Sequence, residues 1–429
     1  MSSLLTGGGG ASVSAPAPRR VRLENDLTVI FREHRAADVA AVQLWAGVGA
    51  RDEREEEESG LSHFIEHLLF KGTPTRAPGD IDRTISALGG EINAATSQDF
   101  TYYHVVLPAR HVTTALEVVG DAAMNAIFDP AELERERLVV LEEIRRSRDD
   151  PNGYLWRVLT RHHFAGHPYA RDVLGTPESI GGVSRERVVD YHRRHYAPNN
   201  AAVVIVGNLD AGETLAQVAK VFGSWEPRPR PVRPRVAPPG LAAAQRIEES
   251  RPLQQAYLGV AWQGPTVPDD AVYATDLLAS ILGHGRSSRL YQGLKERRGL
   301  VSSIGASFYA QREAGTLVVT ARAGADERHR VEGALLEEIA RLRDEPVGEA
   351  ELARALTGVE AGYAFGHETA EGLAYSYGLA ETLWTLDFEL GYLDAVRRVT
   401  GAQIREAATR YLVPDRFTAA VLSPEEARP

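Results

Sequence analysis

A single change in composition divides this chain of 429 residues into two halves of similar length. Residues 224–239 read SWEPRPRPVRPRVAPP and are rich in proline and arginine, with no hydrophobic period. Because proline fixes φ and lacks a backbone donor, this stretch favours an extended, semi-rigid linker over a helix or a central strand. We therefore predict a disordered tail over residues 1–19, folded units over residues 20–223 and 244–429, and a linker over residues 224–243.

The two halves are expected to repeat one order of elements: strands, a helical segment, a strand pair, long helices and a closing strand. Alternating or continuous apolar runs predict strands at residues 20–32 (a hairpin), 38–48, 91–96, 100–107, 201–207, 245–249, 255–262, 302–309, 315–322 and 417–422. Helical patterns predict helices at residues 78–88, 110–128, 130–149, 154–164, 185–195, 269–282, 287–297, 326–343, 349–363, 369–383 and 401–411. We infer an α+β protein made of two homologous units, each a mostly antiparallel sheet packed with helices.

A metal-binding pattern lies in residues 60–73, which read GLSHFIEHLLFKGT. On a helix, His63 and His67 are one turn apart and share a face, and Glu66 joins that face. This H-x-x-E-H order is the inverzincin arrangement. A catalytic zinc site also needs a third protein ligand and an open position. The acidic run at residues 52–58 is expected to be a solvated loop, and Ser59 is a suitable cap for this helix.

The third ligand must be a histidine or a carboxylate, because the chain contains no cysteine. The predicted helix at residues 130–149 offers Glu136 and Glu143, which are seven residues apart and share a face. Either of them can ligate a metal while the other holds a ligand histidine. His163 and His167 have the same spacing as the first pair, but the glycine and proline around His167 indicate a helix end, so no metal site is expected there.

Several longer stretches resemble the pitrilysin superfamily of zinc peptidases, in particular the subgroup of chains of about this length that includes mitochondrial processing peptidase. The matching stretches are SHFIEHLLFKGTPTR, GGEINAATSQDFTYY, ERERLVVLEEI, GHPYARDVLGTPESI and YHRRHYAPNNAAVVIVGN. They are spread nearly from end to end of the first half, over residues 62–208. The resemblance implies zinc held by His63, His67 and Glu143, with Glu136 as a supporting residue and Glu142 as the nearest rival ligand.

The resemblance also implies how a peptide would meet the metal. Glu66 would take the proton of the attacking water and pass it to the leaving amine. The strand at residues 91–96 would receive the peptide backbone, with Asn93, Ala94 and Ala95 as contact residues. Phe64 would either shape a side-chain pocket or pack the core.

One part of the second half departs from the family pattern. Self-sufficient members carry an arginine and, seven residues later, a tyrosine that contact the bound peptide. Here these positions fall on Lys295 and Ser302 in the stretch LKERRGLVSSIG. Lysine lacks the planar fork of arginine, and serine is too short to replace a phenol. Because two-chain members divide these duties, the chain resembles the zinc-bearing subunit of a heterodimer.

The expected function is therefore a zinc metalloendopeptidase that cleaves peptides or unfolded segments in a clamshell chamber, with a homologous partner supplying the Arg/Tyr pair. The alternatives are a self-sufficient homodimeric peptidase and a non-catalytic structural homologue. The formal charge of −11 argues against a nucleic-acid partner. No apolar run approaches a membrane span, and the N-terminus lacks the pattern of a signal peptide, so we expect a cytoplasmic protein with no membrane partner.

Overall fold

The computed structural model describes residues 17–54, 56–238 and 240–425. Most of the predicted tail, residues 1–16, lies outside the described residues, whereas Arg19 already belongs to the first strand. The first sheet contains β1 (Arg19–Arg22), β2 (Thr28–Glu33), β3 (Val39–Ala46), β4 (Glu91–Thr96), β5 (Thr101–Pro108) and β6 (Ala201–Gly207). Its strand order is β1-β2-β6-β3-β5-β4, which places β4 at an edge.

The second sheet repeats this plan. It contains β7 (Gln245–Arg251), β8 (Ala256–Gly264), β9 (Ser303–Ala310), β10 (Gly315–Ala323) and β11 (Thr418–Pro424). The strand order is β7-β11-β8-β10-β9, so β9 is an edge strand just as β4 is. In each sheet a single pair is parallel, β2 with β6 and β7 with β11, at corresponding positions. The predicted duplication and the α+β class are therefore confirmed.

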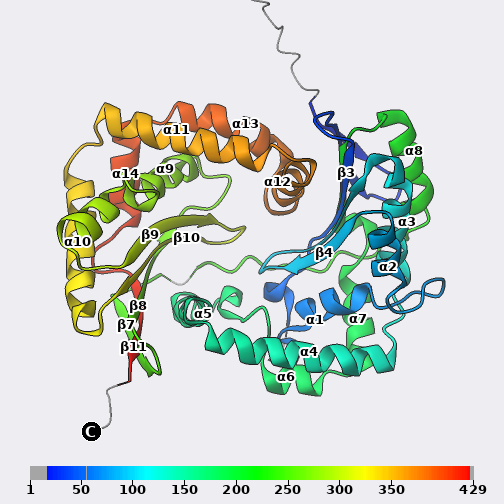
Figure 1. Ribbon diagram of the computed structural model, residues 1–429, viewed down its shortest axis with the longest axis horizontal. Helices are drawn as coiled ribbons and strands as arrows, with labels where there is room; N and C mark the ends of the chain where they lie inside the picture. Colours follow the sequence, from blue (N-terminus) through cyan, green and yellow to red (C-terminus); the bar gives the residue numbers. More distant parts are fainter. Residues whose placement is uncertain (1–16, 55, 239, 426–429) are drawn as a thin grey trace, which may run out of the picture.

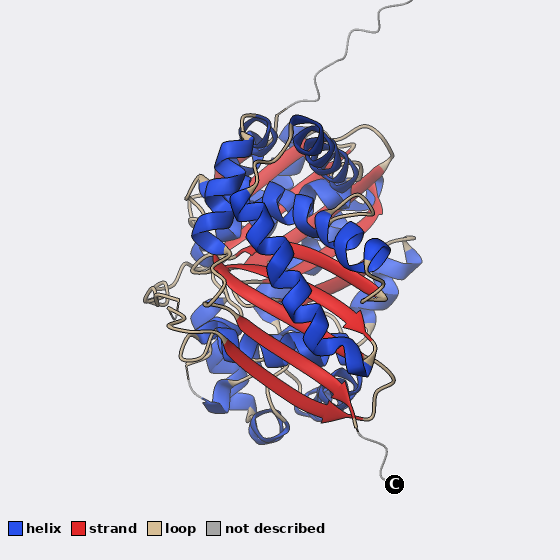
Figure 2. Cartoon of the chain, turned by 90° about the vertical axis from the view of Figure 1, so that its left-hand side faces the viewer, coloured by secondary structure: helices blue, strands red, loops and turns tan. Residues whose placement is uncertain are grey.

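Helices pack on both sheets, and Figure 2 shows a layer of them in front of the strands. The first half contributes α1 (Leu61–Leu69), α2 (Asp80–Ala87), α3 (Val112–Asn125), α4 (Pro130–Asp149), α5 (Pro151–His163), α6 (Pro177–Gly182), α7 (Arg185–His195) and α8 (Ala211–Phe222). The second half contributes α9 (Ala271–Gly283), the π-helical segment η6 (Tyr291–Arg297), α10 (Arg328–Asp344), α11 (Glu349–Gly366), α12 (Ala370–Leu383), α13 (Leu386–Arg397) and α14 (Gly401–Tyr411). Of these, α6, α8 and α13 were not expected from the sequence.

The two units lie side by side and exchange one helix each (Figure 1). Helix α5 of the first half packs on β8 and β11 of the second sheet, where Leu155 and Leu159 join a buried cluster. Helix α12 of the second half packs on β3 and β6 of the first sheet. A side chain at Gly378 of α12 would collide with the indole of Trp45 on β3, because its Cβ would lie 2.0 Å from the ring nitrogen. The exchange joins the two halves through apolar contacts on both sheets.

The acidic run before α1 is not simply the solvated loop that its composition predicts. Glu53 is fully buried, and its carboxylate accepts hydrogen bonds from the backbone N–H groups of Gly60 (2.9 Å) and Ser62 (3.0 Å). These are N–H groups that an α-helix leaves without internal partners. Glu53 therefore caps α1, and the expectation that Ser59 does so is wrong. Burial raises the pKa of Glu53 to about 8, although both amide donors oppose the shift.

We expect Glu53→Ala to lower the free energy of unfolding by about 1–3 kcal/mol, because it removes a buried cap and leaves two N–H groups without acceptors. The matched control is Glu57→Ala, since Glu57 is exposed and pairs with Arg187 at the surface. That change should stay within about 0.5 kcal/mol of the parent chain. Chemical denaturation of the three proteins measures the difference. Equal losses in both variants would contradict the cap.

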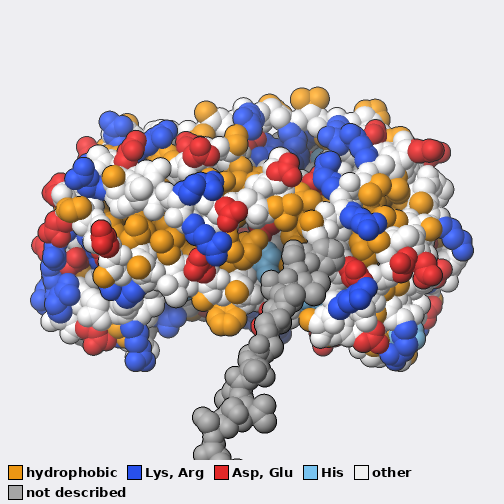
Figure 3. Space-filling view, turned by 90° about the horizontal axis from the view of Figure 1, so that it is seen from above, with side chains coloured by type: hydrophobic (Ala, Val, Ile, Leu, Met, Phe, Trp, Pro, Cys, Tyr) orange, Lys and Arg blue, Asp and Glu red, His pale blue; other side chains and the backbone are white. Residues whose placement is uncertain are grey.

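The surface seen from above carries acidic and basic side chains interspersed with apolar ones (Figure 3). None of the helices in the described ranges combines the length and the apolar composition that crossing a bilayer requires.

Candidate metal centre

Helix α1 presents its motif residues because its other face is anchored in the first core. Leu61, Phe64, Ile65 and Leu68 are at most 1% exposed and pack in the same apolar cluster as the first sheet. The helix starts at Gly60, whose φ of +84° favours glycine. A Cβ there would also lie 2.6 Å from the carbonyl oxygen of residue 174. The anchored helix contacts both β4 and α4.

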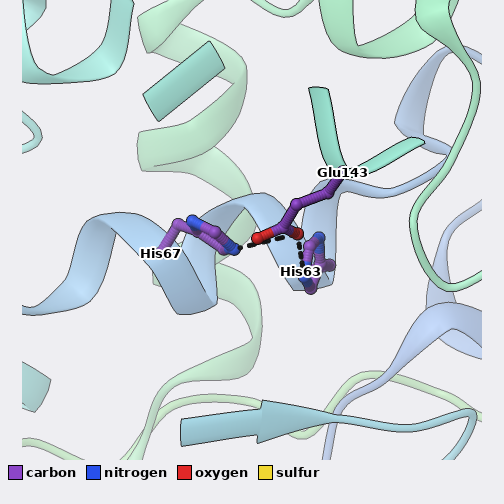
Figure 4. A group of neighbouring side chains, drawn as sticks. All are labelled: His63, His67 and Glu143. Carbon is purple, nitrogen blue, oxygen red and sulfur yellow. Dashed lines mark ion pairs between the residues drawn. The ribbon is translucent and has the colours of Figure 1, made fainter. Parts of the chain in front are cut away.

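Three predicted ligands meet where α1 faces α4. The Nε2 atoms of His63 and His67 lie 3.5 and 3.6 Å from Oε2 of Glu143. Figure 4 shows the three side chains pointing toward one another. Their donor atoms all lie within 4.8 Å of one another, which makes them a group able to hold a metal ion. Ligand atoms bound tetrahedrally at about 2.0–2.1 Å from one zinc ion lie about 3.3–3.4 Å apart, so the donor set fits zinc.

The contacts around His67 are those expected around a metal-ligating histidine. Nδ1 of His67 lies 3.0 Å from Oε2 of Glu136, whose other oxygen lies 2.8 Å from Nζ of Lys71. A hydrogen bond at Nδ1 directs Nε2 toward the metal position. Burial lowers the pKa of His67, but the bond to Glu136 and the nearby carboxylates outweigh it, so the pKa is raised.

His63 is held in the form that metals bind. Burial, reinforced by the neighbouring His67, lowers the pKa of His63 to about 3. The ring is therefore neutral at pH 7 and keeps a lone pair for a cation. In the described structure, its Nδ1 is buried without a hydrogen-bond partner.

The rival ligand Glu142 is turned away from this group. Its carboxylate pairs with Arg145 at 2.7 Å and with Arg146 at 2.9 Å, on the solvent side of α4. Within the described residues Glu143 pairs with no arginine, and its Oε2 lies toward the two histidines instead. The family resemblance favoured Glu143 over Glu142, and the helical rotation of α4 turns Glu143, not Glu142, toward the histidines.

The two histidines of the second pair make separate contacts. His163 ends α5 and lies 3.3 Å from Oγ1 of Thr418 in the second half. His167 lies beyond that helix and faces the carbonyl oxygen of Val236 at 3.1 Å. Each ring therefore has its own structural contact, and α5 ends at His163, as the glycine and proline around His167 predict.

Glu66 is fixed by a residue that the sequence reasoning missed. Oγ1 of Thr96, at the end of β4, donates a hydrogen bond of 2.6 Å to Oε2 of Glu66. Burial raises the pKa of Glu66, while this bond opposes the shift. Thr96 pairs with Thr101 across the hairpin, and Thr101 in turn donates to the carbonyl oxygen of Val48 at 3.0 Å. The repeated threonines in TSQDFT were the available signal.

The predicted substrate residues lie on the edge strand β4. The register pairs Asn93 with His104, Ala94 with Tyr103 and Ala95 with Tyr102. Because side chains alternate along a strand, Ala94 shares the face of Thr96 toward α1, whereas Asn93 and Ala95 lie on the other face. The free edge of β4 can pair with an extended peptide.

Phe64 does not line a substrate pocket. Its side chain is fully buried in the first core, and the guanidinium of Arg137 lies over its ring, 5.7 Å from the centroid. On an amphipathic helix the residue after His63 points away from the histidine face. The prediction of a substrate contact at Phe64 is therefore wrong, and the core-packing alternative is correct.

The chain combines two duplicated α+β units with a helix that carries the inverted His-x-x-Glu-His order. The distant Glu143 completes the set of candidate ligands. Together these features define an inverzincin-like class of protein. The family model described as insulinase (peptidase family M16) matches residues 28–177, which contain all the candidate metal ligands. The model described as the peptidase M16 inactive domain matches residues 182–359. The chain belongs to peptidase family M16.

Relatives and solved structures agree with this membership. An uncharacterized zinc protease of Mycobacterium bovis is 34% identical over 418 residues, covering 96% of this chain and 94% of that protein. The uncharacterized zinc protease YmxG of Bacillus subtilis is 26% identical, covering 95% and 98%. The fold matches a protease from Helicobacter pylori with a TM-score of 0.90 and 22% identity, covering 95% of this chain and 100% of that one. A peptidase M16 inactive domain from Pseudomonas fluorescens matches with a TM-score of 0.88 and 18% identity, covering 96% and 99%.

Proposed function

We propose that this chain is a zinc-dependent metalloendopeptidase. The observation that carries the proposal is the convergence of His63, His67 and Glu143 on one point, beside a Glu66 that Thr96 holds in place. The relatives named zinc proteases support the same chemistry. When bound by these three residues, zinc supplies Lewis acidity, which acidifies water and polarises a peptide carbonyl.

Glu66 would move the proton. Its Oε2 accepts from Thr96, so Oε1 is the oxygen left to take a proton from water as the water oxygen attacks the carbonyl carbon. The same Oε1 would return that proton to the amide nitrogen as the C–N bond breaks. Glu136 would contribute indirectly, by keeping His67 in one orientation.

Thr96 gives a test of this arrangement that does not alter an ionisable group. Thr96→Val keeps the side-chain shape but removes the hydroxyl, so we expect kcat to fall by about tenfold, since one hydrogen bond to a charged group is lost. KM and zinc content should stay the same. Thr96→Ser keeps the hydroxyl and should restore most of kcat. Steady-state kinetics on one peptide measures all three proteins, and equal losses for Val and Ser would contradict the role.

The substrate would bind through its backbone. An extended peptide can pair with the free edge of β4, at Asn93, Ala94 and Ala95, by main-chain hydrogen bonds. Such pairing selects an extended conformation more than a sequence, so short peptides and unfolded segments are the proposed substrates.

The partner proposal rests on the two departures in the second half. Nζ of Lys295 lies over the ring of Tyr291, 5.0 Å from its centroid. The hydroxyl of Ser302 donates to the carbonyl oxygen of Arg322 at 3.3 Å. Neither residue reproduces the planar fork or the phenol that family members use on a peptide. We therefore propose that a homologous chain of similar length supplies the Arg/Tyr pair and closes the chamber, with the cytoplasm as the proposed compartment.

One experiment tests both the activity and the partner. A quenched fluorescent peptide is incubated with the chain alone and with the chain co-expressed with a homologous chain that carries the Arg/Tyr pair, each with and without a zinc chelator. We expect strong, chelator-sensitive cleavage only in the co-expressed complex. Full activity of the chain alone as a homodimer would reject the partner, and no cleavage in either sample would favour a non-catalytic homologue.

A further inference from the structure

The second half contains a cavity of about 440 Å³ lined by three elements, α9, β9 and α11, together with Tyr392 of α13. Figure 1 shows these three elements together in the left-hand unit. The internal duplication relates β9 to β4, α9 to α1 and α11 to α4, by their places in the sheet order and along the chain. The cavity therefore lies in the second unit where the metal centre lies in the first.

The residues around this cavity differ in kind from the metal ligands. Its walls carry four aromatic rings, those of Phe308, Tyr309, Tyr363 and Tyr392. The rings of Tyr363 and Tyr392 are nearly parallel, with an interplanar angle of 13° and centroids 5.9 Å apart. Cavities of this size with aromatic walls and a few polar groups are typical ligand sites.

One carboxylate, that of Asp276 on α9, gives the cavity its formal charge. The hydroxyl of Tyr392 donates a hydrogen bond to it. No lysine or arginine is among the lining residues, and the ion pairs of the described chain include none with Asp276. His284, the other ionisable lining residue besides the tyrosines, is exposed at the end of α9. A carboxylate among aromatic rings, with no lysine or arginine beside it, is stabilised when a positively charged group binds next to it.

We propose that this cavity binds an organic cation, an ammonium or guanidinium group on an aliphatic stem, as in a lysine or arginine side chain. The carboxylate of Asp276 would pair with the charged group. The aromatic faces would attract the cation through their quadrupoles and cover the stem. A single carboxylate with one exposed histidine offers too few ligands for a hard metal ion, which takes six or more oxygens. The binding does not depend on peptide hydrolysis. If the chain does cleave peptides, the natural source of the cation is a basic side chain of the substrate.

Isothermal titration calorimetry of the full chain tests the site with three probes: Nα-acetyl-lysine amide, agmatine and the neutral Nα-acetyl-norleucine amide. We expect both cations to bind and the neutral probe to bind at least tenfold more weakly. Asp276→Asn keeps the shape and the bond from Tyr392, and should weaken cation binding at least tenfold. Asp394→Asn changes an exposed carboxylate on α13 and serves as the matched control, because its side chain is 74% exposed.

A second variant tests the site independently, in case Asp276→Asn does not fold. Tyr309 is 47% exposed, so Tyr309→Ala should fold normally while removing one aromatic wall, and we expect it to weaken cation binding severalfold. Cation affinities unchanged in both Asp276→Asn and Tyr309→Ala would overturn the proposal. So would equal affinity for the lysine and norleucine probes.

Peptide kinetics then separates the two sources of the cation. If the substrate supplies it, peptides in which lysine replaces norleucine have a lower KM, and Asp276→Asn removes that preference. If a free amine supplies it, the calorimetric binding is present and the KM preference is absent. Because calorimetry needs no cleavage, a chain that fails to hydrolyse peptides can still pass the binding test, so the two proposals fail separately.

Discussion

Glu66→Gln is expected to reduce kcat for peptide cleavage by about 10²–10⁴-fold, the range that positioned acid–base groups contribute. Glutamine keeps the size of the side chain and an oxygen to accept the bond from Thr96, but it cannot take a proton from water. Zinc content should stay at the level of the parent chain, because Glu66 is not one of the three converging ligands. Steady-state kinetics and elemental analysis on the same preparation measure both quantities.

The matched control is Glu117→Gln on α3, since Glu117 is an exposed carboxylate outside the site. It should retain both kcat and zinc. A Glu66→Gln chain that cleaves the peptide within tenfold of the parent rate would reject Glu66 as the general base. Loss of zinc in that variant would instead make Glu66 a ligand.

Glu143→Gln is expected to weaken zinc binding by more than about a hundredfold, because it removes a charged ligand, whereas changes to residues that merely support ligands cost about 10- to 100-fold. Peptide cleavage should fall with the metal content. Glu142→Gln is a closely matched control, because the two glutamates are adjacent on α4 and Glu142 pairs with Arg145 and Arg146. Its zinc affinity should stay within about twofold of the parent chain.

Competition titrations with a chromophoric zinc chelator compare these two variants under one set of conditions. If Glu142→Gln releases zinc while Glu143→Gln retains it, the rotation of α4 in the structure is wrong at this point. Equal losses in both would indicate that the acidic character of α4, rather than one ligand, attracts the metal.

Much of the fold is predictable because local patterns agree with it. Strand β5 alternates buried and half-buried side chains along TYYHVVLP, as the sequence pattern indicates. Helix α4 spans Pro130–Asp149, which is the range that its helical pattern predicts, and Asp129 caps its start. The exchange of α5 and α12 was not predictable, because the contact of Gly378 with Trp45 joins positions more than three hundred residues apart and leaves no local signature.

The candidate metal centre was likewise predictable only where local sequence patterns or the family resemblance identified its residues. The spacing of His63 and His67 identified the ligand helix, and the family resemblance selected Glu143. In contrast, Glu53 and Thr96 make hydrogen bonds to groups that only the folded structure brings next to them. An acidic run usually indicates solvent exposure, so composition pointed away from the buried Glu53. The repeated threonines of TSQDFT indicate a polar hairpin but do not identify Glu66 as the carboxylate that Thr96 contacts.

The most direct test of the metal centre is anomalous diffraction at the zinc absorption edge, from crystals of the Glu66→Gln chain grown with zinc. We expect one strong peak within bonding distance of Nε2 of His63, Nε2 of His67 and the carboxylate of Glu143. Absence of a peak at that point, or a peak held by other side chains instead, would contradict it.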